Sequence, residues 1–173
     1  MHPYQAWPFL SDPRHPLLSA VWAIGVHGVI AVFVISPILR RAGHRGALAL
    51  GAFVAGSVFD LDHIAAAGTL NVHAMESLAG GRPNSHSLIV VLLLSATAYA
   101  LTRRAAVAWA VFAIFLSHLL FDAAGGSDRV LYPLSGLDGL PWLAFPIGTL
   151  ALFGGSLAIT LRSRRPRAAL EPA

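Results

Sequence analysis

The chain has 173 residues and a formal net charge of +4, and 56% of its residues are hydrophobic while only 12% are charged. Soluble domains contain about a quarter charged residues, so this composition favours a membrane protein. The lack of cysteine excludes disulfides and thiolate metal sites. We expect no nucleic-acid partner, because the arginines adjoin apolar segments as topology signals do.

The apolar segments predict an all-α, polytopic membrane helix bundle. A helix that crosses the hydrocarbon core needs about 20 mostly apolar residues, with a range of about 17 to 25. Five segments meet this requirement, at residues 18–39, 46–64, 86–102, 105–124 and 140–161. We therefore predict a single transmembrane domain over residues 1–173. It would include an irregular or interfacial segment at 1–17 and a cytoplasmic tail at 162–173.

The arginines predict how this bundle is oriented. Most of them fall on one side of the five segments: Arg40, Arg41, Arg45, Arg103, Arg104, Arg162, Arg164, Arg165 and Arg167. Only Arg14, Arg82 and Arg129 fall on the other side. Basic residues concentrate in cytoplasmic loops, so we expect the N-terminus outside and the C-terminus in the cytoplasm of a plasma or bacterial inner membrane.

Several ionisable residues interrupt the apolar segments on the arginine-poor side. Each would cost roughly 2.5 to 3.5 kcal/mol on insertion, so such residues indicate function. The candidates are His27, Asp60, Asp62, His63, His86, His118 and Asp122. At 1.5 Å per residue, His27 and His118 should lie about 9 to 14 Å below the outer surface. We expect these groups to converge in the outer half of the bundle.

Spacing within the motifs favours a metal site. His118 and Asp122 are four residues apart, and Asp60 and His63 are three apart, so each pair shares one helix face. Imidazole nitrogens and carboxylate oxygens without sulfur suit zinc, manganese, iron or nickel. The plainer alternative is a hydrogen-bonded pair that locks helices together.

The order of the motifs resembles that of the membrane-bound metal-dependent hydrolases of bacterial and archaeal inner membranes. That family shows an early helix histidine, then P-D-x-D-H, H-R-G-x-T-H-S, S-H-x-x-x-D and an aromatic-proline pair. The counterparts here are His27, "FDLDH" at 59–63, "GRPNSHS" at 81–87, "SHLLFD" at 117–122 and "YP" at 132–133. Phe59 replaces the proline, and Gly81 replaces the first histidine of the second motif.

A fainter similarity links the ligand order to zinc-dependent phospholipases C and nucleases, and it would make Asp122 a carboxylate that bridges two metals. Together the resemblances imply metal-assisted hydrolysis with one or two divalent ions, zinc first among them. The metal ligands would be His27, Asp60, His86, His118 and Asp122. Asp62 or His63 would be the general base or an orienting group, and Arg82 would neutralise an anionic substrate.

The expected depth of the site favours a membrane lipid or a lipid-linked ester as substrate, including a phosphoester. A different class of function uses the same residues. A transporter or channel for a divalent cation or for protons also needs acids and histidines inside the membrane. A transport path needs polar groups on both sides of the midplane, whereas "AVFVISPIL" and "IVVLLLSATAYAL" carry no charge. A structural protein whose buried pairs only specify packing is the third alternative.

Overall fold

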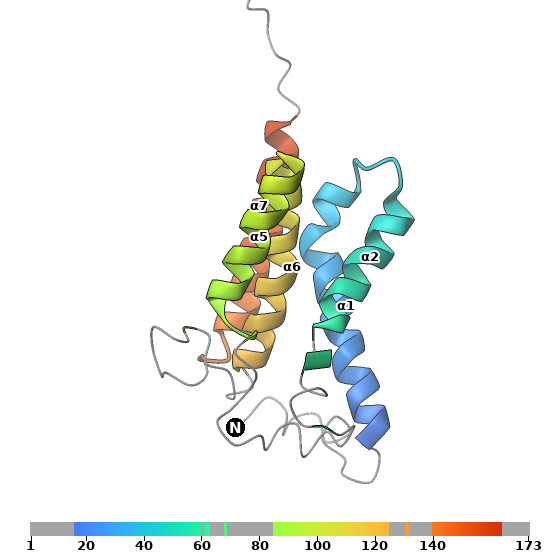
Figure 1. The fold of residues 1–173 in the computed structure, drawn as a ribbon, viewed down its shortest axis with the longest axis vertical. Coiled ribbons are helices and arrows are strands. Elements are labelled where there is room, and N and C mark those ends of the chain that lie inside the picture. The colour runs from blue at the N-terminus through green and yellow to red at the C-terminus, as the bar shows by residue number, and fades with distance from the viewer. Residues whose placement is uncertain are drawn as a thin grey trace, which may run out of the picture.

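The computed structural model of this chain describes residues 16–59, 61–62, 68, 85–124, 131 and 140–163. The described residues form five helices and no strand, which confirms the all-α prediction (Figure 1). The helices are α1 (Pro16–Leu39), α2 (Arg45–Val58), α5 (Leu88–Thr102), α6 (Ala105–Ala124) and α7 (Ala144–Arg162).

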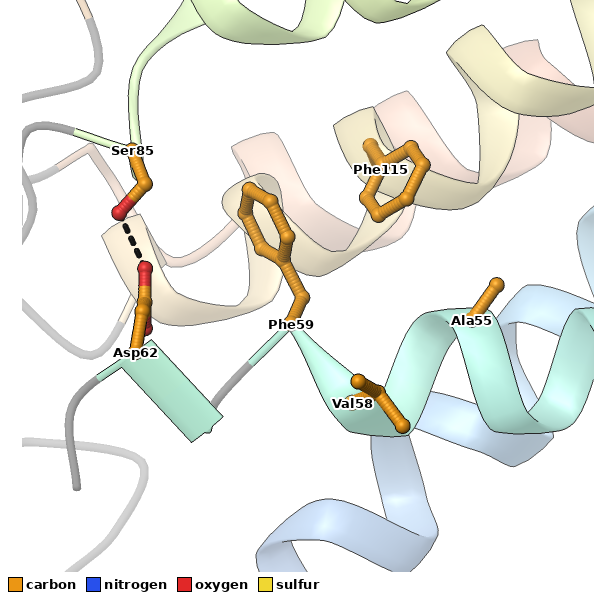
Figure 2. Close-up of a pocket in the computed structure, with 6 residues that line it drawn as sticks. All are labelled: Ala55, Val58, Phe59, Asp62, Ser85 and Phe115. Carbon is orange, nitrogen blue, oxygen red and sulfur yellow. Dashed lines mark hydrogen bonds between the residues drawn. The ribbon is translucent and has the colours of Figure 1, made fainter. Parts of the chain in front are cut away.

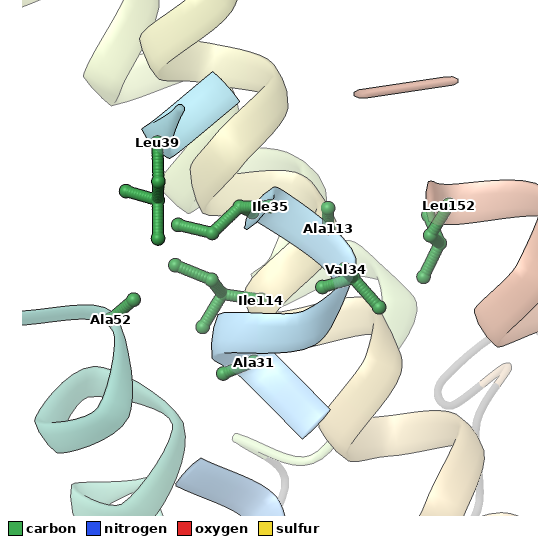
Figure 3. Packing of buried hydrophobic residues seen from close by; sticks show 8 residues of the cluster. All are labelled: Ala31, Val34, Ile35, Leu39, Ala52, Ala113, Ile114 and Leu152. Carbon is green, nitrogen blue, oxygen red and sulfur yellow. The ribbon is translucent and has the colours of Figure 1, made fainter. Parts of the chain in front are cut away.

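Helices α1 and α6 form the centre of this bundle. Helix α1 packs against α2, α6 and α7, and α6 packs against α1, α5 and α7. Apolar side chains from four of the helices fill the space between them (Figure 3). This hydrophobic core consists of Ala31, Val34, Ile35, Leu39, Ala52, Ala113, Ile114 and Leu152.

Three helices are shorter than the sequence predicts, and each loses its residues at the same end of the bundle. Helix α2 ends at Val58 rather than near residue 64, and α5 begins at Leu88 because Ser87, its N-cap, has an extended backbone. Helix α7 begins at Ala144 rather than near residue 140. Pro141 keeps residue 140 out of the helix, since a residue that precedes proline avoids the helical conformation, and residues 142 and 143 form a turn before Ala144.

Helices α6 and α7 are long and apolar enough to cross a membrane. The other apolar helical stretches among the described residues, Ile24–Leu39, Arg45–Val58 and Leu88–Thr102, are shorter. At 1.5 Å per residue, the 14 residues of α2 extend about 21 Å, less than the roughly 30 Å hydrocarbon core. The structure therefore supports two candidate spans and does not confirm five.

Glycines let α1 and α2 approach closely. A Cβ on Gly56 would lie 2.7 Å from the Cβ of Ala31 and 3.0 Å from the backbone oxygen of His27. The hydroxyl of Ser57 also donates a hydrogen bond to the backbone oxygen of Ile24 across the two helices, at 2.9 Å. Backbone contact of this kind needs small residues. It places His27 directly beside the last turn of α2.

Candidate metal centre

Ionisable side chains from several parts of the sequence meet at the end of the bundle where α2 ends and α5 begins. His27 comes from α1, His118 and Asp122 come from α6, and His86 lies just before α5. Their exposed fractions are 3%, 1%, 1% and 2% in that order. Groups this deeply buried need polar or charged partners, because burying them alone is costly.

The carboxylate of Asp122 is the centre of the cluster. Its Oδ1 lies 3.2 Å from Nε2 of His27. Its Oδ2 lies 3.1 Å from Nε2 of His118 and 3.7 Å from Nε2 of His86. The contact with His118 follows from the four-residue spacing on α6. One carboxylate therefore contacts three imidazole rings, each through its Nε2 atom.

A backbone carbonyl fixes the protonation of His118. Its Nδ1 lies 2.9 Å from the backbone oxygen of Gly56 in a buried hydrogen bond. That carbonyl belongs to the last turn of α2, where backbone oxygens have no partner within the helix. A carbonyl can only accept, so Nδ1 of His118 carries the proton. In the neutral ring, Nε2 then directs its lone pair toward Asp122.

For His86, a carboxylate contacts the outer ring nitrogen, as the carbonyl of Gly56 does for His118. Nδ1 of His86 lies 3.1 Å from Oδ2 of Asp62. The hydroxyl of Ser85 donates a hydrogen bond to the same carboxylate oxygen (Figure 2). The negative charge favours a proton on Nδ1, so Nε2 of a neutral His86 also directs a lone pair inward. Histidines that bind metals are typically held this way, with the outer nitrogen on a carboxylate or a carbonyl.

The inward-facing atoms form a triangle of acceptors. Nε2 of His86 lies 3.2 Å from Nε2 of His118, and both atoms face Oδ2 of Asp122 at 3.7 Å and 3.1 Å. With neutral rings, three acceptors at these distances repel one another unless a cation lies between them. In a tetrahedral zinc site with bonds of about 2.0–2.1 Å, ligand atoms lie about 3.3 Å apart.

A second group of three overlaps with this triangle. One donor atom from each of His27, His118 and Asp122 lies within 4.8 Å of the other two, and all three residues are buried. His118 and Asp122 belong to both groups. The donor set, with imidazole nitrogens and one carboxylate, is the type that zinc and similar divalent metals prefer. This group could therefore hold a metal ion.

Aromatic rings enclose the cluster. The ring of His27 stacks on that of His118, with centroids 3.8 Å apart, and Phe121 meets His27 edge-on. The ring of Phe59 lies 4.6 Å from the ring of His86 and 5.2 Å from that of His118, measured between centroids. Apolar walls lower the local dielectric and so strengthen each charge interaction inside them.

The structure thus brings together His27, His86, His118 and Asp122, four of the five residues expected to bind metal. The fifth, Asp60, lies outside the described residues, as do His63 and Arg82, the groups expected to act as base and anion ligand. The Gly81 position and the pair Tyr132 and Pro133 also lie outside them. Asp62 is described, and it contacts His86 and Ser85 rather than Asp122.

Three contributors to this cluster were not predicted from the sequence. Ser85 immediately precedes His86, and its hydroxyl could have been proposed as a partner from that position alone. The motif pattern identifies Phe59 only as a replacement for proline. The carbonyl of Gly56 could not be found from sequence, because every residue has a carbonyl and only helix packing selects one.

Comparisons with known proteins do not add to this description. No family model, no curated protein and no solved structure matches the chain. The resemblance to membrane-bound metal-dependent hydrolases therefore remains a prediction from the motifs.

Replacing Asp62 by alanine is expected to weaken zinc binding by about 10- to 100-fold, the usual effect of losing a carboxylate behind a histidine ligand. The reason is that His86 would lose the contact that orients its ring. Asp62→Asn should keep part of the affinity, because the amide oxygen can still accept from Nδ1. Competition with a chromogenic chelator measures both constants. Wild-type affinity in Asp62→Ala would show that His86 does not depend on this contact.

Proposed function

We propose that the protein is a multi-pass membrane protein whose whole bundle lies in the bilayer. Large apolar side chains are exposed on α1, α2, α5 and α7, the helices around α6. They include Val29, Phe33, Leu48, Leu50, Val54, Leu92, Leu93, Leu101, Ile147, Leu150 and Leu157. An apolar surface of this extent is unusual in water and normal in contact with lipid. It supports membrane insertion of the helices that are too short to qualify by length.

The arginines support an outward-facing site. Those within the described residues lie where α1, α5 and α7 end and where α2 and α6 begin, at the end of the bundle remote from the His and Asp cluster (Figure 1). They are Arg40, Arg41, Arg45, Arg103, Arg104 and Arg162. Under the positive-inside rule that end is cytoplasmic. The cluster then lies in the half of the bundle nearer the outer surface of a plasma or inner membrane.

The proposed activity is metal-dependent hydrolysis of a lipid or a lipid-linked ester, including a phosphoester. The observation that carries it is the triangle of acceptors from His86, His118 and Asp122. The outer nitrogen of His118 is also hydrogen-bonded to a backbone carbonyl, an arrangement typical of histidines that bind metals. His27 completes the set through the second oxygen of Asp122. Zinc is the ion that this donor set suits best, with manganese, iron and nickel as alternatives.

A bound divalent cation would supply Lewis-acid polarisation of the ester and activation of the attacking water. The chain's own residues have separate tasks. Asp122 supplies the negative charge, and the carbonyl of Gly56 holds His118 in the tautomer whose Nε2 faces inward. The side chain of Asp62 is 28% exposed and borders a pocket. It can therefore reach a substrate and act as the general base, one of the roles that the motif leaves open for Asp62 or His63.

Transport of a cation is less well supported than hydrolysis. The core residues between the cluster and the arginine end include Ala31, Val34 and Ala113, all with exposed fractions of 0% (Figure 3). These side chains offer no polar group to a passing ion, and the buried hydroxyls nearer the arginine end, those of Ser156 and Thr160, already take part in hydrogen bonds. A transporter would have to separate α1 from α6 along this core, which costs the burial of the apolar side chains packed there.

The proposal is tested by the metal content of the protein purified without chelator, compared with three variants. We expect about one bound metal ion per chain or more in the wild type, as one four-ligand site requires, and little in His118→Ala and Asp122→Asn. His44→Ala is the matched control, because His44 is exposed at the opposite end of the bundle. That variant should keep the wild-type content. Hydrolysis of phosphodiester and carboxylester lipids is then assayed in the same samples.

A wild type that stays metal-free after incubation with zinc would contradict the proposal. In that case a shared proton, rather than a metal ion, satisfies the three acceptors. Zinc-loaded protein that hydrolyses no lipid ester but carries zinc into proteoliposomes, in a manner that needs His118, would favour the transporter.

A further inference from the structure

A pocket adjoins the His and Asp cluster on the side facing α2. Its volume is about 350 Å³, and its lining residues are Ala55, Val58, Phe59, Asp62, Ser85 and Phe115. The ring of Phe59 forms the wall that the pocket shares with the cluster, since it contacts His86 and His118 and also lies 4.9 Å from the ring of Phe115. The proposed hydrolysis uses only the end of this pocket at Asp62, and its apolar part has no role there.

The pocket is polar at one end and apolar along the rest. Figure 2 shows the hydrogen-bonded pair of Ser85 and Asp62 at one end, the ring of Phe59 in the middle, and Val58 and Ala55 farther back along α2. The polar end lies beyond the last residue of α2, while the apolar end runs back toward the middle of that helix. The pocket therefore has the polarity of a lipid in a bilayer, with its headgroup near the helix end.

The pocket also opens to the surface that would face lipid. Val58 borders it and is 47% exposed. Helix α2 extends only about 21 Å, at 1.5 Å for each of its 14 residues. With Arg45 at the cytoplasmic interface, as the arginines suggest, its last turn would lie below the outer surface of a bilayer whose hydrocarbon core is about 30 Å thick. A chain can enter sideways from the membrane at this point without leaving the hydrocarbon region.

We propose that this pocket holds one acyl chain of a membrane lipid, with the ester end of the chain at Asp62 and Ser85. This assignment rests on the proposed function, for which it names the part of the substrate that is recognised. A volume of about 350 Å³ lies at the small end of the range for ligand pockets, about 300–1,000 Å³. It suits one chain rather than the two of a diacyl lipid.

Selection of such a lipid has to come from the polar end. Lipid tails are as apolar as the side chains of the pocket, so moving an acyl chain from the bilayer into it gives no hydrophobic gain. Packing against Phe59 and Phe115 orients the chain. The carboxylate of Asp62 only accepts hydrogen bonds, and the hydroxyl of Ser85 already donates to it, so retention has to come from a donor or a positive charge in the headgroup, such as the choline of phosphatidylcholine. A hydrocarbon without a headgroup should therefore not concentrate there.

The test is photo-crosslinking in phospholipid vesicles with a phosphatidylcholine that carries a diazirine in one acyl chain. We expect the label to concentrate on the last turn of α2 and around Phe115. Val58→Trp, which fills the pocket, should reduce this label to the level found on the outer faces of α5 and α7. Val54→Trp is the matched control, because Val54 lies one turn earlier on α2, is 45% exposed, and does not border the pocket. It should label as the wild type does.

A diazirine-bearing alkane of equal length serves as the probe without a headgroup, and it should label all exposed helix faces evenly. Even labelling of the wild type by the phospholipid probe would overturn the assignment, whether or not the tryptophan variants fold. Each experiment is done with and without chelator. A labelled pocket in a protein that binds no metal would defeat only the hydrolase proposal, and zinc-dependent hydrolysis with even labelling would defeat only the pocket.

Discussion

Zinc added to the metal-free protein is expected to raise its thermal midpoint by about 5–10 °C. A ligand at 100 times its dissociation constant stabilises the folded state by about 2.7 kcal/mol. For a chain of this length, about 1 kcal/mol shifts the midpoint by about 2–4 °C. Asp122→Asn should abolish the shift, because it removes the carboxylate that all three histidine rings contact. Differential scanning fluorimetry in detergent measures the midpoint.

Two controls define what this shift means. His44→Ala should respond to zinc as the wild type does, because His44 lies outside the cluster. Magnesium should give no shift, since it prefers oxygen ligands to imidazole nitrogens. A zinc shift of wild-type size in Asp122→Asn would show that zinc stabilises the protein from some other site.

The second large effect is expected from two glycine substitutions on α2 that should change stability in opposite directions. Gly56→Ala should lower the free energy of unfolding by about 1–3 kcal/mol, the usual cost of overpacking a filled interior. The added Cβ would lie 2.7 Å from the Cβ of Ala31, so α1 and α2 would have to move apart. Gly51→Ala should raise the free energy by about 0.5–1 kcal/mol, because glycine weakens a helix interior. No atom lies within 4 Å of a Cβ at Gly51.

Gly56→Ala should also weaken zinc binding, whereas Gly51→Ala should leave it unchanged. The carbonyl of Gly56 accepts the hydrogen bond from His118, so displacing α2 moves the group that orients this ligand. Reversible unfolding in mixed micelles gives the free energies, and chelator competition gives the zinc affinities. Shifts of the same sign in both variants would contradict the packing argument.

The helices could be located from the sequence because their signal is local. Long apolar segments predicted all five, and the helix at 105–124 has the predicted limits. The errors occurred at Phe59, Ser87 and Pro141, next to the candidate cluster. At Pro141 apolar composition continues beyond the point where the backbone leaves the helix, whereas Phe59 and Ser87 adjoin the polar motifs "DLDH" and "NSH". Hydrophobicity indicates whether a segment is in contact with lipid or with the protein core. It does not indicate at which residue the helical backbone begins or ends.

The participants in the cluster could also be chosen from the sequence. Ionisable residues are costly inside apolar segments, so that cost by itself identifies His27, His118 and Asp122 as candidate site residues. The spacing of four residues predicted the contact between His118 and Asp122, and the common depth predicted that the others would meet them. These inferences need only the geometry of single helices and the direction of each span.

Only the tertiary structure decided how these groups face one another. The contact between His27 and Asp122 depends on how α1 packs against α6, and the anchoring of His118 depends on how closely α2 approaches both helices. The pocket beside Phe59 likewise depends on tertiary structure, because its lining comes from α2, from Ser85 and from Phe115 of α6. The sequence by itself determined which residues are too costly to bury without a purpose, because that cost belongs to each side chain. Helix packing decides which ring nitrogen of each histidine faces Asp122, because that depends on atoms that are far apart in the chain.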